Sequence, residues 1–168
     1  MDTNVLPRLD MSDNETGCCP KFNPAGWDGR HLQFEDKLFV RAVTRGLLHV
    51  PINMGSVFTR VQRAIEDAGA EEADGYLVMS RDVSSTEAEH FFAVTREVPG
   101  EEMVRLSGTF MTRVFEGHYR HAKDWAHDME VAAEAAGHRA KRVFMFYTTC
   151  PKCARAYGKN YVVGIAEI

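Results

Sequence analysis

The chain has 168 residues, enough for one domain with a sizeable core. Its 45% hydrophobic and 26% charged residues are typical of a folded protein, and the net charge of -4 provides no basic field that would attract nucleic acid. No apolar run is long enough to span a bilayer, and the polar, acidic residues 1–17 do not resemble a signal peptide. We therefore expect a cytoplasmic protein without nucleic-acid or membrane partners.

The N-terminal part divides into a tail and an arm. Residues 1–17 are rich in Asp, Asn, Ser and Thr, which predicts a disordered or loosely draped tail. Residues 18–36 contain prolines and glycines that oppose regular structure, yet they carry four large apolar side chains, Phe22, Trp27, Leu32 and Phe34. Side chains of this size in an irregular segment predict an arm that buries them against a domain formed by residues 37–168.

The domain shows the same order of elements twice. The first half predicts a strand at 37–50, a helix at 53–68 and strands at 76–81 and 89–98. The second half predicts a strand at 103–115, a helix at 118–136 and strands at 142–148 and 160–168. Gly69 and Gly137 end the two helices at corresponding positions. The expected fold class is α+β, with two pseudo-twofold strand–helix–strand–strand repeats, two helices on one face of an antiparallel sheet, and a ligand groove between the repeats.

This repeat, together with the sequence FEGHY at 115–119, resembles the gyrase-inhibitor-like (GyrI-like) small-molecule-binding domains, which include effector-binding domains of AraC-type and multidrug-sensing regulators. The hallmark of that superfamily is Gly-Pro-Tyr at the junction between strand and helix, and here Gly117 and Tyr119 match while His118 replaces the proline. More narrowly, the segments CCPKF, LHVPINMG, LSGTFMTRVFEG and FYTTCPKCARAYGKNYVV are similar to a bacterial subfamily that is sometimes labelled hydrolase. The resemblance covers residues 37–168 and implies a small-molecule-binding domain.

One position departs from the superfamily. The strand after the second helix commonly reads Phe-Glu-x-Tyr there, with the glutamate facing the groove, whereas this chain reads FMFY, so that Met145 takes the place of the glutamate and Tyr147 is retained. The charge that would bind a cation or act as a general base is therefore missing. Strand alternation places Met145 and Tyr147 on one face. The residues expected to line the ligand groove are Phe110, Tyr119, Trp125, Met145 and Tyr147, which predicts a largely apolar ligand.

The four cysteines are the clearest chemical signal. Cys150 and Cys153 form a C-x-x-C turn of the kind that supplies half of a structural zinc site, and Cys18 and Cys19 supply a second pair. Four thiolates would complete a tetrahedral site and tie the arm to the second half of the chain. Because adjacent cysteines chelate one metal awkwardly, His31 or His49 is an alternative ligand. Two other interpretations remain, a redox pair at Cys150 and Cys153, or unpaired thiols; the residues after the motif are expected to form a loop, whereas a redox thiol favours a helix N-terminus.

Three functions follow as hypotheses. The first is a stand-alone protein that binds a small, largely apolar molecule and carries a structural zinc. The second is a hydrolase acting in the same groove, with Tyr147 assisted by His49 or Glu116; whether the protein is an enzyme is left open. The third is a protein that acts on a macromolecular partner, as gyrase inhibitors do, or a thiol redox protein. The absence of a glutamate at Met145 favours the first.

Overall fold

The computed structural model describes residues 2–10, 12 and 14–168. In these residues the chain forms three α-helices and seven strands, and every strand pairing described below is antiparallel. The chain divides into two compact units, which we call unit 1 (Met1–Phe34 and Gly108–Ile168) and unit 2 (Glu35–Ser107). No helix in the described part of the chain is long and apolar enough to cross a membrane.

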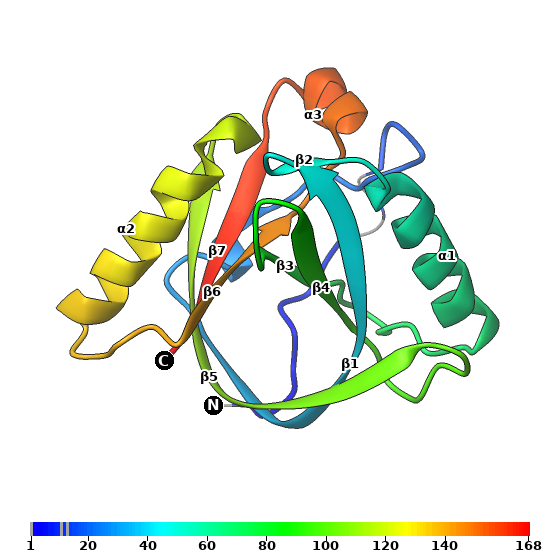
Figure 1. Ribbon diagram of the computed structural model, residues 1–168, viewed down its shortest axis with the longest axis horizontal. Coiled ribbons are helices and arrows are strands. Elements are labelled where there is room, and N and C mark those ends of the chain that lie inside the picture. The colour runs from blue at the N-terminus through cyan, green and yellow to red at the C-terminus, as the bar shows by residue number, and fades with distance from the viewer. Residues whose placement is uncertain (1, 11, 13) are drawn as a thin grey trace. The chain divides into compact units, whose positions relative to one another are not determined.

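Unit 2 contains the first repeat. Its elements are β1 (His31–Leu47, from residue 35 onward), β2 (Val50–Pro51), α1 (Met54–Asp67), β3 (Val78–Asp82) and β4 (Glu87–Ala93), with the strand order β2-β1-β4-β3. Helix α1 lies beside these strands (Figure 1). Its apolar face, formed by Val57, Val61 and Ile65, packs against Val40 and Phe92 of the strands. Residues spaced three and four apart share one side of a helix, which explains why this side is buried.

Unit 1 contains the second repeat and the arm. Its elements are the 3-10 helix η1 (Pro24–Gly26), β5 (Glu102–Glu116, from residue 108 onward), the 3-10 helix η2 (Tyr119–His121), α2 (Ala122–Ala135), β6 (Arg142–Tyr147), α3 (Pro151–Tyr157) and β7 (Tyr161–Glu167). The strand order is β6-β7-β5. Helix α2 lies along these strands and buries Trp125, Met129 and Ala133 (Figure 1). Gly164 allows this close approach, because a Cβ atom there would lie 2.7 Å from Met129 Sδ.

The predicted fold class, two strand–helix–strand–strand repeats with antiparallel strands, is confirmed. Both predicted helix ends are followed by a left-handed glycine, Gly69 with φ 60° and Gly137 with φ 83°. The second helix begins later than expected, because the chain first makes the 3-10 turn η2. The expectation of a loop after the second cysteine pair is wrong, since the chain there forms helix α3, which ends at Tyr157.

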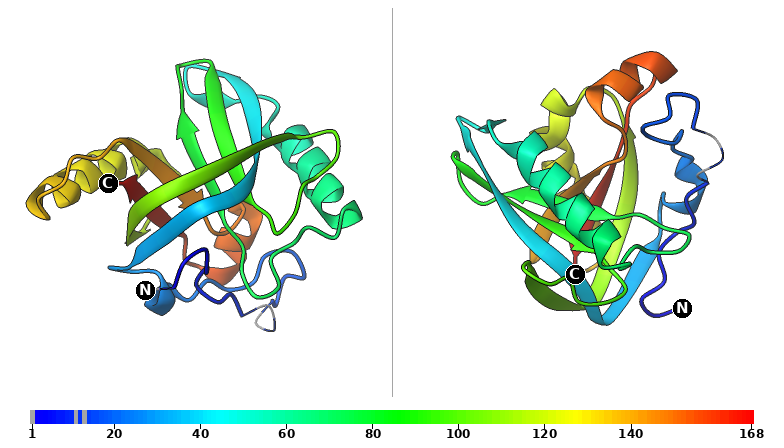
Figure 2. Two further views of the ribbon diagram at one scale, coloured as in Figure 1. Left: turned by 90° about the horizontal axis from the view of Figure 1, so that it is seen from below. Right: turned by 90° about the vertical axis from the view of Figure 1, so that its right-hand side faces the viewer.

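The aromatic arm is buried as predicted. Phe22, Trp27, Leu32 and Phe34 are each at most 9% exposed. The arm is less irregular than expected, because β1 begins at His31 and the alternating residues of the HLQF sequence already lie in a strand. The tail makes one isolated bridge, between Thr3 and Gln33, and residues 1, 11 and 13 of the predicted loose tail lie outside the described residues. Figure 2 shows the blue arm beside the orange helix α3 in both views.

A strained turn joins β1 to β2. Leu47 pairs with Val50, which leaves Leu48 and His49 as a two-residue turn with φ values of 49° and 65°. Both values are in the left-handed region, which costs a residue with a Cβ about 1–2 kcal/mol. The Leu48 side chain is 76% exposed and so gains little packing in return.

Replacing Leu48 by asparagine is therefore expected to raise the free energy of unfolding by about 0.5–1 kcal/mol, because asparagine tolerates this conformation and is favoured in such turns. Urea unfolding measures the change. The matched control is Leu47→Asn, since Leu47 is also exposed but precedes the turn and lacks a positive φ. Equal effects at the two positions would contradict the argument from backbone strain.

A buried histidine connects three strands of unit 2. The His90 ring is fully buried, and its Nε2 and Nδ1 atoms lie 2.8 Å from Thr44 Oγ1 and 2.7 Å from Ser80 Oγ. The ring also contacts Phe58 edge-on, with 4.9 Å between ring centroids. Burial lowers the pKa of His90 from 6.5 to about 4, because the charged ring would lose its hydration.

We expect His90 to make the stability of the protein depend on pH. Since the folded pKa is below the unfolded one, neutral His90 contributes stability that is complete above about pH 6.5 and is lost as the pH falls through 4, with a total of roughly 3 kcal/mol. The free energy of unfolding should be measured from pH 7.5 to 4.5 for the wild type and His90→Gln, with His138→Gln as an exposed control. If His90→Gln shows the same pH dependence as the wild type, the buried neutral histidine is not its cause.

Candidate metal centre

Contacts other than those of the cysteines hold the arm against the strands of unit 1. The ring of Trp27 packs 5.2 Å from that of Phe146, and Phe22 lies 6.2 Å from Trp27. The Thr112 hydroxyl donates to the Trp27 carbonyl, and the Val114 amide donates to Asp28 Oδ1 over 2.9 Å. These contacts join the arm to β5 and β6 and hold the nearby Cys18 and Cys19 against the same unit.

The second cysteine pair lies at the start of α3. Cys150 is the N-cap residue, Pro151 is the first helical residue, and Gly158 ends the helix with φ 73°. Proline at this position already has a helical φ, and a left-handed glycine closes a helix C-terminus. Both signals are visible in the sequence, although the interpretation as a loop did not use them. Because α3 begins here, Cys150 and Cys153 lie on its first turn and can face one point.

The four sulfur atoms gather as the sequence predicts. Every Sγ atom of Cys18, Cys19, Cys150 and Cys153 lies within 4.8 Å of the other three, and Cys18 Sγ is 3.7 Å from Cys19 Sγ. In a tetrahedral site with Zn–S bonds of about 2.3 Å, the sulfur atoms are about 3.8 Å apart. Adjacent cysteines can thus both turn towards one centre. Neither His31 nor His49 joins the group, which consists of the four cysteines among the described residues.

Two hydroxyl groups support the cluster. Thr16 Oγ1 lies 3.2 Å from Cys153 Sγ and 3.3 Å from the Tyr157 hydroxyl, and it accepts a hydrogen bond of 3.3 Å from the Cys18 amide. The Tyr157 hydroxyl donates to the Cys19 carbonyl. Thr16 and Tyr157 therefore connect the arm to α3. No local pattern in the sequence marks either residue, because only the folded chain brings them together.

The thiols differ in acidity. Burial raises the pKa of the Cys19 thiol to about 12, whereas the hydrogen bond with Thr16 lowers the pKa of the Cys153 thiol to about 7. A bound cation would favour the thiolate at all four positions, and metal binding would release protons. Soft thiolate donors in a closed group of four fit Zn²⁺, which is commonly held this way in structural sites.

The predicted ligand residues fall into two groups. Trp125 and Met145 belong to one buried cluster with Val162, on the side of the strands that α2 covers. Tyr147 follows Met145 on this face, is 39% exposed, and meets Tyr119 edge-on with 6.3 Å between ring centroids.

Phe110 does not join them. Phe110 is fully buried, and its ring centroid lies 5.1 Å from that of Phe34. The strand register places it on the opposite face from Met145. The structure therefore brings together Tyr119, Trp125, Met145 and Tyr147, and leaves Phe110 in the core beneath the arm.

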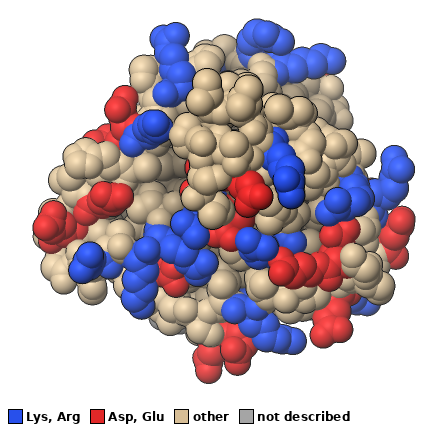
Figure 3. Space-filling model, in the orientation of Figure 1, with Lys and Arg blue, Asp and Glu red and all other residues tan. Residues whose placement is uncertain are grey.

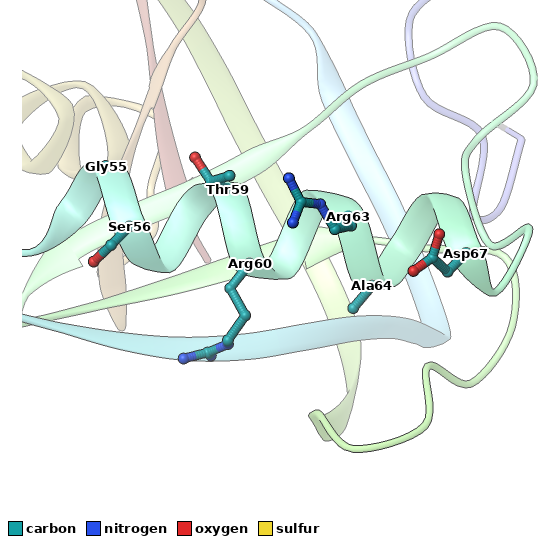
Figure 4. A pocket seen from close by; sticks show the side chains of 7 residues that line it. All are labelled: Gly55, Ser56, Thr59, Arg60, Arg63, Ala64 and Asp67. Atoms are coloured by element: carbon teal, nitrogen blue, oxygen red, sulfur yellow. The ribbon is translucent and has the colours of Figure 1, made fainter.

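A hollow of about 570 Å³ lies along the outer side of α1. All of its lining residues, Gly55, Ser56, Thr59, Arg60, Arg63, Ala64 and Asp67, come from this one helix (Figure 4). Arg60 already pairs with Glu101 over 3.2 Å. A ligand there would contact a single convex surface, so this hollow does not have the geometry of a binding site.

Taken together, the fold and the site describe an α+β protein with two strand–helix–strand–strand repeats and a cluster of four thiols. The chain belongs to the family described as Bacterial hydrolase, whose model matches residues 9–168. The match covers all of unit 2, unit 1 from residue 9 onward, and all four cysteines. No curated protein matches the chain.

Proposed function

We propose that this member of the bacterial hydrolase family is a small-molecule-binding protein in which four cysteines hold a structural zinc ion. One observation carries the zinc: the four Sγ atoms lie within 4.8 Å of one another, although Cys18 and Cys150 are far apart in the sequence. Four thiolates complete a tetrahedral shell and leave no position for water or substrate. The metal therefore stabilises the arm and α3 and takes no part in a reaction.

A thiol redox function is the alternative for the same residues. It is favoured by the start of α3 at Pro151, since thiols on the first turn of a helix are more acidic. The proximity of Cys18 and Cys19 to Cys150 and Cys153 favours a metal site instead. Thiol titration of protein purified without chelator distinguishes the two: a metal site gives thiols that react only after zinc is removed, whereas a reversible Cys150–Cys153 disulfide would transfer the assignment to redox chemistry.

The small molecule is assigned to the surface that Tyr119, Trp125, Met145 and Tyr147 form on the α2 side of β6 and β7. The partly exposed rings of Tyr119 and Tyr147 there are suited to a flat, largely apolar ligand, and they lie beside the buried Trp125 and Met145, the latter where GyrI-like domains commonly have a glutamate. The order of elements in the two repeats supports the resemblance to those domains. Strand alternation accounts for the shared face of Met145 and Tyr147.

Binding is tested with native mass spectrometry of freshly purified protein and with the dye 1-anilinonaphthalene-8-sulfonate. Tyr147→Ala is expected to weaken dye binding about tenfold, which corresponds to a loss of about 1.4 kcal/mol. Val131→Ala is the matched control, because Val131 is 50% exposed on α2 and lies outside the proposed surface. Equal affinities of the wild type and Tyr147→Ala would refute this surface.

A hydrolase is the second candidate, and the description of the family favours it. Glu116 does not fit as the partner of Tyr147, because the strand register places the two side chains on opposite faces. The His118 ring centroid lies 4.7 Å from that of Tyr119, and the Tyr119 ring in turn contacts Tyr147. Hydrolysis of p-nitrophenyl acetate that is abolished by Tyr147→Phe would favour this candidate. Inhibition of DNA supercoiling by gyrase would favour a macromolecular partner.

A further inference from the structure

A second, smaller cavity lies beside the four-cysteine cluster. Its volume is about 240 Å³, and every residue that lines it belongs to unit 1: Lys21, Phe22, Thr149, Tyr157, Lys159 and Tyr161. The first two follow Cys18 and Cys19 in the arm, Thr149 precedes Cys150, and the others come from α3, the turn after it and β7. The cavity therefore forms where the arm meets α3, and it is separate from the surface around Tyr147.

The charges around this cavity are positive. Lys21 and Lys159 are its two charged lining residues, and no carboxylate lines it. Lys21 pairs with Glu15 over 2.8 Å, but both side chains are well exposed to water. Among the residues that the structure describes, no carboxylate pairs with Lys159. In Figure 3 the upper edge of the molecule, where Figure 1 places α3, shows blue side chains and no red ones. Two ammonium groups at one cavity in a chain with net charge -4 form a local site for an anion.

The walls of the cavity are aromatic. Phe22 is 9% exposed and lies 5.9 Å from the ring of Tyr161. The Lys21 ammonium lies 5.5 Å from the centroid of the Tyr157 ring. Aromatic walls bind a planar ring by stacking or edge contacts, and cations at the rim bind its charged group. Ligand pockets for drug-sized molecules are larger, at about 300–1,000 Å³, so this cavity suits a ligand with a single ring.

One hydroxyl group at the cavity can donate to an anion, whereas another already donates its proton within the protein. Thr149 is 7% exposed, and its Oγ1 atom donates to Asn160 Oδ1 over 3.3 Å, which fixes the orientation of the hydroxyl group. The Tyr161 hydroxyl has no hydrogen-bond partner within the described part of the protein. It is available to donate to an anion held between the two lysines.

We propose that this cavity binds a small aromatic anion, a single ring that carries a carboxylate or a phosphate group. The ring lies against Phe22, Tyr157 and Tyr161, and the anionic group is bound by the ammonium groups of Lys21 and Lys159. Two of the six lining residues, Lys21 and Phe22, come from the arm, so ligand binding and arm docking stabilise each other. The inference does not depend on a metal at the cysteines or on the ligand surface at Tyr147.

Titrations of the full-length protein followed by amide NMR shifts test the site. The probes are benzoate, phenyl phosphate, inorganic phosphate and the uncharged benzyl alcohol. Benzoate, phenyl phosphate or both should cause saturable shifts at residues 149–161, whereas benzyl alcohol and inorganic phosphate should bind more weakly. If no aromatic anion saturates by roughly 10 mM, or if benzyl alcohol or inorganic phosphate binds as tightly as the aromatic anions, the proposal is wrong.

Charge variants locate the binding. Lys159→Gln and Lys21→Gln should each weaken the binding of the aromatic anion about tenfold, because a hydrogen bond to a charged group is lost. Lys152→Gln removes an exposed lysine of α3 that does not line the cavity, and it should leave the affinity unchanged. Glu15→Gln should strengthen binding, since it removes the carboxylate that competes for Lys21. Equal losses in Lys159→Gln and Lys152→Gln would assign the effect to net charge and overturn the site.

Discussion

Replacing Cys150 by serine is expected to release the arm and to lower the free energy of unfolding by about 4 kcal/mol. A ligand present at about a thousand times its dissociation constant stabilises the folded protein by this amount, and the stabilisation is lost when the ligand no longer binds. The residues nearest the proposed metal have little regular structure of their own, since α3 has seven residues and the described part of residues 14–30 contains only the short helix η1. A metal that joins both offsets the entropy lost when they become ordered.

Urea unfolding measures the loss, and the fluorescence of Trp27, which is 2% exposed, reports the release of the arm. Removing zinc from the wild type with a chelator should reproduce the effect, and the chelator should not further destabilise Cys150→Ser. Ala154→Ser on the same helix is a control that adds the same hydroxyl group away from the cluster. Full stability of chelated wild-type protein would contradict a structural metal.

The second large effect is expected at Trp27. Truncation of a buried tryptophan to alanine costs about 3–5 kcal/mol, because the site cannot fully collapse around the missing ring. Trp27 contacts Phe22 and Phe146, and its loss leaves a cavity between the arm and β6. Trp27→Phe should retain most of the stability, since an aromatic ring still fills the site.

This prediction also tests whether the arm has two independent attachments. Trp27 and the cysteines hold the same segment, so Trp27→Ala and Cys150→Ser should together cost less than the sum of the single changes. A double-mutant cycle from urea unfolding gives the coupling. Strict additivity would indicate that the aromatic contacts and the cysteine cluster stabilise different parts of the protein.

The order of the elements could be read from the sequence because it depends on local periodicity. The apolar side of α1 and the left-handed glycines that follow α1 and α2 are signals within a few residues of one another. The early start of β1 was missed because the prolines and glycines before His31 concealed the alternation of Leu32 and Phe34. Helix α3 was missed although Pro151 and Gly158 mark its two ends.

The candidate site was predictable only in part. The C-x-x-C turn and the adjacent cysteine pair indicated four ligands for one metal, and the four sulfur atoms do lie together. The place of Phe110 depends on how β5, β7 and β6 align, and this register is set by contacts distant in sequence. The same holds for Thr16 at the cluster and for the cavity between Lys21 and Lys159, since no local pattern relates these residues.

Zinc analysis combined with X-ray absorption at the zinc edge, on protein purified under reducing conditions without chelator, tests the four-cysteine zinc site directly. We expect one zinc ion per chain, surrounded by four sulfur atoms at about 2.3 Å. Protein that contains no zinc and has four freely reactive thiols, or a metal with nitrogen and oxygen ligands in place of sulfur, would contradict this expectation.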